Sequence, residues 1–526
     1  MLINAILILI FSTLCTASTS RLFKYLGDTP YQNQSSVSST ITTPLRIQRD
    51  LGANVTIDQL IWPTLSLSSA YFQDNYSFAR LSGVRDILDM GYKRLILDIY
   101  WDQLDWQLCP FPLQSIPDDT TCSSNATLAQ FLSIVNEYLV STETARMATK
   151  TDLVFIVLNL HDLSTNTNTT DSNLAEIIQN SISNTTSAPR IYTPFNLTTD
   201  RLDMNLSFFA NGRQSYFLLL QQQQSNVWPQ WLYLIQNNVQ LLVGFGTLPT
   251  GKTSYRLTSL DNHTIFDSTS LVRGVTFQSC PQNHSWAFAS DMNQTSFTYT
   301  TAVNVTECGY SPYFTSSNYS TNKSIASDFD RGHLADNILS TIWSWDINEP
   351  QANKDKRCAA MLLHNGRWKA TDCSEQYRVA CRSLDDPDTW MITQDIYSYD
   401  RSMTSCPDNY TFDVPHIPRQ NTILKRLLDQ TDIEQDRVWI NLNWAYNEDS
   451  CWVIGRYGTC WWADDNGQAF LGLIRTSVVS GVIILILVGI FTWVKCARLW
   501  RNRNSKSRKA MVKKMLAKRE YVTIPA

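Results

Sequence analysis

Histidine is scarce in this sequence, which has six among 526 residues. The histidines follow no metal-ligand spacing, and the patterns HExxH, GxSxG and CxxC are all missing. Their absence excludes the common motifs of zinc hydrolases, serine hydrolases and dithiol enzymes. The sequence therefore predicts no metal site, no cofactor and no nucleophile.

Charged side chains are missing from two apolar segments. Residues 1–17 contain an apolar run and end with Cys15 and Ala17 as the small residues of a cleavage site, which is typical of a secretory signal. Residues 476–494 contain no charge. At about 1.5 Å per residue a helix of this length spans roughly one hydrocarbon core, so we expect a transmembrane helix there.

Acidic residues are nearly missing beyond this apolar segment, because residues 495–526 contain 11 Lys or Arg and one acid, Glu520. Positive charge marks the cytosolic side of a span. We therefore expect a single-pass type I membrane protein of the secretory pathway, in the endoplasmic reticulum or later, with residues 18–475 lumenal or extracellular. The whole chain carries −4 and this tail carries +10, so the preceding residues carry −14, which disfavours nucleic acid as a direct partner.

Cysteines and glycosylation sites agree with an ectodomain in an oxidising compartment. Ten cysteines lie between the signal and the span, enough for five disulfides, with Cys109–Cys122 and Cys451–Cys460 as candidate pairs. The N-x-S/T acceptor sites all precede the span, which predicts a glycosylated surface. They are Asn33, Asn54, Asn75, Asn125, Asn168, Asn184, Asn196, Asn205, Asn262, Asn283, Asn293, Asn304, Asn318, Asn322 and Asn409.

Continuous apolar strands alternate with helical segments, which indicates a parallel sheet covered on both faces. We expect an α/β fold, a TIM-type (β/α) barrel. Residues 44–246 form its first part and 386–470 its closing part, while the Ser/Thr/Asn-rich segment 247–385 is a Cys-rich insertion. Expected strands are 92–101, 152–160, 239–246 and 437–444, and expected helices are 78–91, 131–145, 228–238 and 422–430.

The segment Gly246–Thr253 matches the phosphate-binding pattern GxxxxGK[ST] and follows a predicted strand. A phosphate-binding loop needs a helix that begins at the Lys. The continuation SYRLTSLDNHTIFDSTS has no helical stripe, so we interpret the match as a Gly-Pro turn after a strand.

The segment GYKRLILDIYWD at 91–102 resembles the barrel of phosphatidylinositol phospholipases C, in which a strand ends in a Leu-Asp pair. A calcium-binding acid of that family corresponds to Ile96 here, and the stretch with its catalytic His reads PTLS at 63–66. Asp98, Asp102, His161 and Asp162 are the catalytic set that can be assembled, with capping and loop roles as the alternative. The main interpretation is a barrel that has lost catalysis. A phosphodiesterase acting on a phospholipid or glycolipid head group is the alternative.

The segment WSWDINEPQ at 343–351 and the cysteines after it resemble the C-terminal half of a C-type lectin domain, over 340–383. The resemblance implies a Cys358–Cys373 disulfide and a partner for Cys381, such as Cys308. The calcium-binding pair that follows the strand Trp in that family reads Lys369-Ala370 here. We therefore expect that the calcium site is lost, and a glycan-binding receptor is an alternative function.

Together these features resemble the fungal maintenance of telomere capping protein 6 family, over essentially the whole chain. The family name implies a link to telomere capping, and the predicted topology argues that this link is indirect. The resemblance implies a non-catalytic glycosylated membrane protein with a protein, glycan or lipid partner on the lumenal side. In the tail, Tyr521 and Ile524 fit a tyrosine-based sorting signal.

Overall fold

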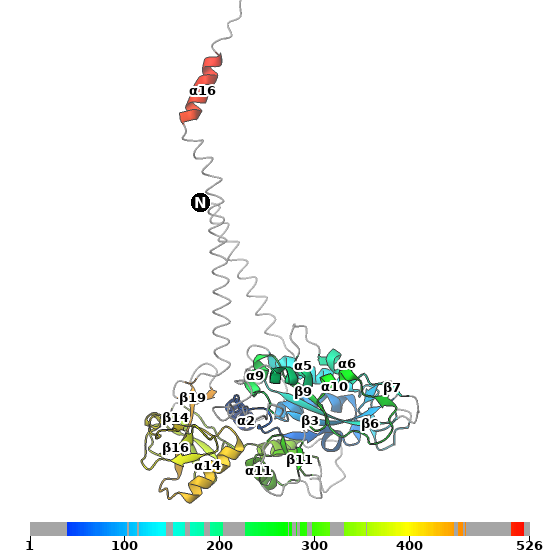
Figure 1. Ribbon diagram of the computed structural model, residues 1–526, viewed down its shortest axis with the longest axis vertical. Helices are drawn as coiled ribbons and strands as arrows, with labels where there is room; N and C mark the ends of the chain where they lie inside the picture. Colours follow the sequence, from blue (N-terminus) through cyan, green and yellow to red (C-terminus); the bar gives the residue numbers. More distant parts are fainter. Residues whose placement is uncertain are drawn as a thin grey trace, which may run out of the picture. The chain divides into compact units, whose positions relative to one another are not determined.

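A computed structural model describes most of the chain. It covers residues 39–102, 105–112, 115–143, 151–163, 169–182, 190–202, 227–271, 273–275, 280, 285–291, 297–315, 331–353, 355–445, 451–455, 458 and 506–519. The chain divides into two compact units, of which one is Met1–Trp444 with Cys451–Tyr457 and the other is Ala445–Ser450 with Gly458–Ala526. The second unit contains helix α16 (Lys506–Arg519), drawn in red in Figure 1.

Several features predicted near the two ends fall outside the described residues. They are the signal segment 1–17, the apolar segment 476–494 and the tail motif at Tyr521 and Ile524. None of the described helices is both long enough and apolar enough to cross a membrane. The signal, the span and the sorting motif therefore remain predictions.

The larger unit contains a parallel sheet, here called the barrel sheet. β1 (Thr64–Ser66), β3 (Arg94–Trp101), β6 (Val154–Asp162) and β9 (Leu241–Phe245) pair side by side in chain order, and every pair is parallel. The first five residues of β6 are all buried, as expected for a strand covered on both faces. These strands confirm the expected α/β fold.

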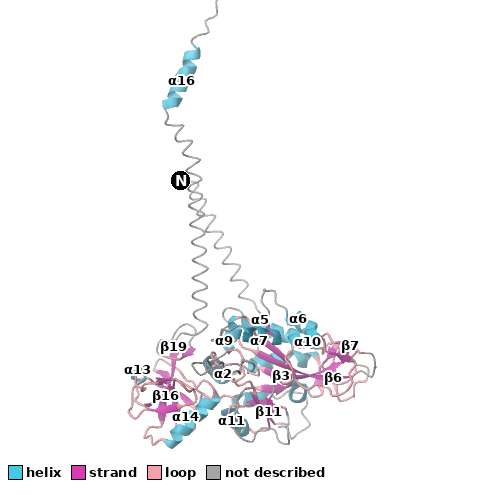
Figure 2. Cartoon of the chain, in the orientation of Figure 1, coloured by secondary structure: helices cyan, strands magenta, loops and turns pink. Residues whose placement is uncertain are grey.

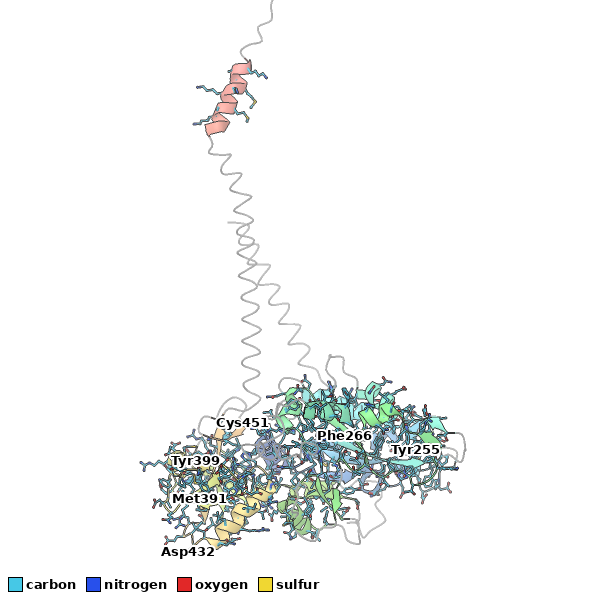
Figure 3. All side chains as sticks on the ribbon, in the orientation of Figure 1. Tyr255, Phe266, Met391, Tyr399, Asp432 and Cys451 are labelled. Atoms are coloured by element: carbon cyan, nitrogen blue, oxygen red, sulfur yellow. A yellow bond between two sulfur atoms is a disulfide. The ribbon has the colours of Figure 1, made fainter. Side chains whose placement is uncertain are left out.

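Shorter strands extend the barrel sheet at both edges. β8 (Ile191–Tyr192) pairs with β9, and Phe266, labelled in Figure 3, continues that edge through a parallel bridge to Gly244. On the other side, β13 (Ser311–Phe314), β12 (Ala287–Ser290) and β11 (Arg273–Val275) follow outward from β1. β13, the last strand of this sheet along the chain, thus lies beside β1, the first. This is the strand order of a TIM-type barrel. Over the described strands the order runs from β11 to β8 and is open between them.

Helices follow the strands along the chain and lie beside the barrel sheet (Figure 2). In α5 (Leu128–Glu143), Leu128, Phe131, Leu132 and Val135 recur at helical spacing and lie in the barrel core. The other helices of this part are α2 (Ser39–Leu51), η1 (Leu67–Phe72), α3 (Phe78–Ser82), α4 (Val84–Met90), α6 (Leu174–Ile182), α7 (Pro194–Leu202), α9 (Trp231–Gln236), α10 (Ser259–Thr264), α11 (Tyr299–Glu307) and α12 (Arg331–Leu339). Its remaining short strands are β2 (Asn75–Tyr76), β4 (Trp106–Gln107), β5 (Thr121–Cys122), β7 (Thr170–Asp171) and β10 (Tyr255–Arg256).

The helix predicted over 78–91 is divided into α3 and α4 at Gly83. A Cβ atom at Gly83 would lie 2.3 Å from the hydroxyl of Tyr71, so only glycine allows this close approach. Gly91 ends α4 with a φ of 121°, a backbone conformation that favours glycine. The periodicity predicted the apolar face correctly, but a tertiary contact determines the break.

The prediction that 247–385 is an insertion is wrong in its first part. β11, β12 and β13 lie in that segment, and they pair with one another and with β1 as part of the barrel sheet. These strands are three or four residues long and are separated by polar loops. They therefore lack the long apolar runs that identify β3, β6 and β9.

Residues 356–453 form a separate sheet, here called the C-terminal sheet. Its strands run in the order β15-β14-β19-β16-β17, with β18 on β16 and β20 on β19. They are β14 (Lys356–Leu362), β15 (Trp368–Asp372), β16 (Arg378–Ser383), β17 (Trp390–Ile392), β18 (Tyr410–Phe412), β19 (Arg437–Ala445) and β20 (Cys451–Val453). Its helices are α13 (Tyr399–Ser402) and α14 (Pro418–Gln430).

The prediction that 386–470 closes the barrel is also wrong. The predicted strand exists as β19, but β19 pairs with β14 and β16 in the C-terminal sheet. Helix α14 supplies Leu424 and Leu428 to the core of that sheet. A helix followed by an apolar strand has the same pattern in either sheet, so the pattern could not identify the partner strand.

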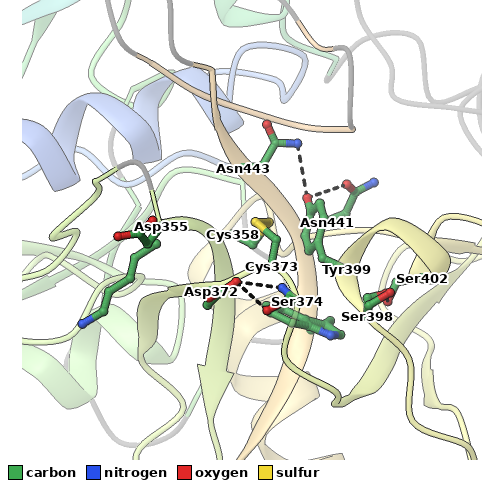
Figure 4. The surroundings of a disulfide bond; sticks show 12 residues. Asp355, Cys358, Asp372, Cys373, Ser374, Ser398, Tyr399, Ser402, Asn441 and Asn443 are labelled. Atoms are coloured by element: carbon green, nitrogen blue, oxygen red, sulfur yellow. Dashed lines mark hydrogen bonds between the residues drawn. A yellow bond between two sulfur atoms is a disulfide. The ribbon is translucent and has the colours of Figure 1, made fainter.

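The structure contains four disulfides between described cysteines. Cys109–Cys122 and Cys358–Cys373 are pairs that the sequence favours. Cys451 is also disulfide-bonded, while Cys460, its candidate partner, lies outside the described residues. In Figure 4, Asp372 beside the Cys358–Cys373 bridge accepts hydrogen bonds from the backbone N–H and the hydroxyl of Ser374, both at 2.9 Å.

The expected Cys308–Cys381 pair is wrong. Cys308 ends α11 and bonds to Cys280, with 4.8 Å between the two Cα atoms. Cys381 lies in β16 and bonds to Cys406, with 5.8 Å between the Cα atoms. Cys308 therefore packs against the barrel core, whereas Cys381 lies in the C-terminal sheet. The order of the cysteines along the chain does not reveal this separation.

Helix α2 contributes side chains to two hydrophobic cores. Ile41 packs in the barrel core, whereas Ile47 and Leu51 pack in the core of the C-terminal sheet. The side-chain oxygen of Gln48 accepts a hydrogen bond from the backbone N–H of Trp343 at 2.9 Å. Helix α2 therefore packs against both the barrel core and the core of the C-terminal sheet.

A partly buried charge cluster lies at the C-terminal end of α2. His416 donates from Nδ1 to the Leu51 carbonyl at 2.7 Å, and its Nε2 lies 3.5 Å from a carboxylate oxygen of Asp413. Asp413 also accepts a hydrogen bond from Nε of Arg382 at 2.7 Å. Burial lowers the pKa of His416, but the Asp413 carboxylate and the Leu51 carbonyl outweigh burial and raise the pKa above its ordinary value.

Replacing His416 with glutamine is expected to destabilise the chain more in mildly acid than in alkaline solution. Because the pKa of His416 is higher in the folded chain, its contribution is complete below the unfolded value of about 6.5 and is lost as the pH rises through the folded value. Each unit of difference corresponds to about 1.4 kcal/mol. Denaturant unfolding of both chains at a pH below the unfolded pKa and at a pH above the folded pKa measures this difference, and equal destabilisation at every pH would contradict it.

Candidate functional site

Asp98 and His161 meet at the carboxyl ends of β3 and β6. Nε2 of His161 lies 2.9 Å from Oδ1 of Asp98. The His161 ring stacks on Tyr100, with 4.7 Å between ring centroids and 19° between planes. The side chains are partly exposed, His161 at 40% and Asp98 at 21%. The sequence placed both residues at strand ends, and the structure brings them into contact.

The pairing register explains why these side chains share one face. Asp98 lies opposite Asn159 and Tyr100 lies opposite His161. Successive side chains of a strand point to opposite faces. Their sequence neighbours, such as Leu97 and Leu158, pack in the core under the helices. The four polar residues therefore line the inner face of the barrel sheet, at the end where TIM-type barrels bind ligands.

Asp98 is held by neutral neighbours as well as by His161. Its Oδ1 accepts a hydrogen bond from the Asn159 amide at 3.1 Å, and its backbone N–H donates to the Ser68 hydroxyl at 3.1 Å. Burial alone would raise the pKa of Asp98, but the hydrogen bonds with His161, Ser68 and Asn159 lower it below its ordinary value. The carboxylate is therefore ionised at neutral pH and orients the imidazole.

Asn159 is fixed by the loop after β9. Its side-chain oxygen accepts a hydrogen bond from the backbone N–H of Thr247 at 2.8 Å. A Cβ atom at Gly246 would lie 2.2 Å from that oxygen, so glycine is required there. Beyond Lys252 the chain forms β10 rather than a helix. Gly246, the first glycine of the GxxxxGK[ST] match, thus allows the backbone to lie close to the Asn159 side chain.

Tyr313 of β13 adds a phenol to the same end of the sheet. Burial raises the pKa of Tyr313 to about 12, although a hydrogen bond with Ser66 lowers it, and the charge of Asp98 raises it further. Burial and the charge of Asp98 also raise the pKa of Tyr100 to about 12. Both phenols are neutral at physiological pH and can donate or accept hydrogen bonds.

The other two predicted residues serve the local structure. The Asp162 carboxylate accepts hydrogen bonds from the backbone N–H and the hydroxyl of Ser254, at 2.6 and 2.8 Å, which fixes the end of β6 to the segment before β10. Asp102 begins a turn, in which its backbone N–H donates to the Asp105 carbonyl at 3.1 Å. The candidate set of four therefore divides into the Asp98–His161 pair and two residues that hold local structure.

Sequence reasoning missed Ser68, Asn159, Tyr100 and Tyr313. Asn159 carried a usable signal, because it is a polar residue inside an apolar strand, two positions before His161 and therefore on the same face. Tyr313 had none, because β13 was not recognised as a barrel strand. Across the part of the chain that the structure describes, no three His, Cys, Asp or Glu side chains gather to hold a metal ion.

Comparison with known sequences identifies the family. Residues 35–332, more than half of the chain, match the family described as MTC6 partial TIM-barrel domain. The chain therefore belongs to the MTC6 family. Over the described strands the barrel sheet is open between β11 and β8, which agrees with the word partial in that description.

Similar MTC6-family proteins include two that are named maintenance of telomere capping protein 6. The one from Debaryomyces hansenii is 24% identical over 641 residues, covering 100% of this chain and 99% of the relative. The one from Komagataella phaffii is 25% identical over 467 residues, covering 78% of this chain and 82% of the relative. The relatives thus connect this chain by name with telomere capping.

Solved structures similar to this MTC6-family chain include a phospholipase C and a protein named PLC21. A calcium-dependent phosphoinositol-specific phospholipase C from Pseudomonas sp. is 14% identical, with a TM-score of 0.26, covering 47% of this chain and 79% of that one. PLC21 from S. officinalis is 12% identical, with a TM-score of 0.26, covering 70% of this chain and 51% of that one. These scores are too low to support a comparison of sites.

Proposed function

We propose that this chain is a non-catalytic, glycosylated type I membrane protein of the secretory pathway, whose lumenal part binds a protein, glycan or lipid partner. One observation carries the non-catalytic part. Among the described residues, the side chains that contact Asp98 or His161 by a hydrogen bond or ring stacking, apart from the pair itself, are those of Ser68, Asn159 and Tyr100, and all three are neutral. Phosphodiester cleavage needs an acid, a base and a positive group that stabilises developing charge. One imidazole bound to one carboxylate supplies a single proton-transfer group.

Two observations support a lumenal location for the two sheets. Disulfides persist in oxidising compartments, and both sheets carry them. Six of the acceptor asparagines are exposed in the structure, as glycosylation requires. They are Asn54, Asn75, Asn125, Asn262, Asn304 and Asn409. A lumenal domain cannot reach chromatin, so we propose that the link to telomere capping is indirect.

We also propose that the C-terminal sheet is a divergent C-type-lectin-like fold without calcium-dependent glycan binding. The Glu349–Pro350 peptide bond is cis, and the Cys358–Cys373 bridge lies between β14 and the end of β15. Oε1 of Glu349 lies 4.0 Å from the Lys369 ammonium, and Oε2 accepts from the backbone N–H of Gln351 at 2.8 Å. The carboxylate therefore already has partners within the chain, which disfavours the glycan-binding alternative in its calcium-dependent form.

Replacing Asp98 with asparagine is expected to leave the function of the chain unchanged in cells that otherwise lack it. The purified chain is expected to release no head group from vesicles that contain phosphatidylinositol. Loss of a general acid–base group reduces turnover by about 100- to 10,000-fold. If the unsubstituted chain had even a weak activity, Asp98→Asn would therefore lower it measurably. Asp162→Asn is the matched control, because that carboxylate ends the neighbouring strand β6 but binds Ser254.

A phosphodiesterase remains the second candidate function, supported by the 2.9 Å contact between an ionised Asp98 and His161. An oriented imidazole can remove a proton from a hydroxyl that attacks phosphorus. Head-group release that is lost in Asp98→Asn but kept in Asp162→Asn would establish this enzyme and overturn the non-catalytic proposal.

A further inference from the structure

Helix α16 exposes an apolar stripe. Met511, Val512, Met515 and Leu516 have exposed fractions of 62%, 49%, 59% and 62%. They form two pairs spaced four residues apart, and residues at that spacing are neighbours on one helix face. Exposed large apolar side chains that gather on one face mark an interaction surface.

The rest of the helix is strongly basic. The sequence of α16, KSRKAMVKKMLAKR, contains seven Lys or Arg and no acid. At about 100° per residue, Lys513, Lys514 and Lys518 lie outside the sector covered by the apolar stripe. By their position in the sequence, Arg508 and Arg519 fall within that sector, one before the stripe and one after it.

We propose that α16 lies in the plane of an anionic membrane surface, with the apolar stripe in the acyl boundary and the lysines on lipid phosphates. Over residues 509–518 the four large apolar residues fall in one sector and the lysines in the other, which is the arrangement of interfacial helices. The positive charge selects an anionic surface over a neutral one. If the tail only set the orientation of the span, its positive charge would be sufficient. The exposed apolar stripe has no role in that function, and an apolar surface that covers it gives it one.

The position of α16 in the chain favours a membrane over an acidic protein as the occupant. The predicted span ends at residue 494, and α16 begins at residue 506. A linker of this length holds the helix close to the membrane surface, so binding there is intramolecular and is favoured by effective concentration. This inference rests on the proposed transmembrane topology and is independent of the chemistry at the barrel sheet.

The test places an environment-sensitive fluorophore on each side of the helix. The full chain with Cys496→Ser is labelled either at Met515→Cys, in the stripe, or at Ala517→Cys, about 200° away around the helix. Each chain is reconstituted into vesicles of phosphatidylcholine alone or mixed with phosphatidylserine. All residues from 509 to 518 are exposed, so these substitutions leave the packing of α16 unchanged.

We expect a several-fold rise in emission at position 515 with the anionic lipid, little change at position 517, and loss of the rise in Lys513→Glu with Lys514→Glu. High salt should weaken the response, because exposed charges are then screened. Equal emission at position 515 in the two vesicle types would overturn the proposal. A rise at position 515 that requires added cytosolic protein would also overturn it and would assign the stripe to a protein partner.

Discussion

Replacing Trp368 with alanine is expected to lower the free energy of unfolding of the C-terminal sheet by about 4 kcal/mol. Trp368 is fully buried and packs edge-on against Trp343 and Trp345, with centroid distances of 5.4 and 5.9 Å. Its indole N–H donates to the side-chain oxygen of Asn421 at 2.8 Å, and this buried acceptor would be left unpaired. A cavity and an unpaired polar group therefore add up at one site.

Denaturant unfolding, with hydrogen exchange to locate the change, measures this loss. We expect faster exchange in β14, β15 and β19 and little change in β3 and β6, which belong to the other core. Ile347→Ala is the matched control, because Ile347 lies in the same WSWDINEP segment but is 79% exposed. An equally large loss in this control would show that the segment, rather than the buried indole, stabilises the sheet.

Replacing Cys358 and Cys373 together with serine is expected to cost about 3 kcal/mol. The bridge closes a loop with a sequence separation of 15 residues and so restricts the unfolded chain. Cys358 is also buried in a cluster with Trp439 and Tyr399, so a serine hydroxyl would be placed among apolar side chains. The loss is measured as the decrease in the denaturant midpoint multiplied by the unfolding slope.

The barrel sheet supplies the internal control for the disulfide experiment. Hydrogen exchange in β3 and β6 should be unchanged, because the bridge lies between β14 and the end of β15. Cys496 follows the predicted span and has no expected disulfide partner. Cys496→Ser should therefore leave the denaturant midpoint unchanged. A midpoint unchanged in the double serine chain would contradict a stabilising role for the bridge.

The sequence predicts the elements of this chain better than their partners. β3, β6 and β9 are buried on both faces, so their apolar runs could be recognised without knowing their neighbours. β19 was recognised for the same reason, yet its partners are β14 and β16. Pairing depends on contacts between distant residues, and the apolar run of a strand does not encode them.

The candidate site was half predictable for a related reason. Asp98 and His161 end long apolar strands, so their positions could be inferred from the end of each run. Their contact depends on the register that places Tyr100 opposite His161, which no local pattern specifies. Tyr313 comes from a four-residue strand in a polar region, where neither the strand nor its place in the sheet could be inferred.

The double role of α2 has a consequence for the order in which the chain folds. Gln48 and Trp343 are in contact across 295 residues of sequence. At about 5–20 residues per second, roughly 15–60 s of synthesis separate the two partners. During that time Ile47 and Leu51 have no native core to pack into. Helix α2 can therefore complete its packing only after the C-terminal sheet has been synthesised. A chain interrupted before α14 would leave this apolar helix face for chaperones to hold.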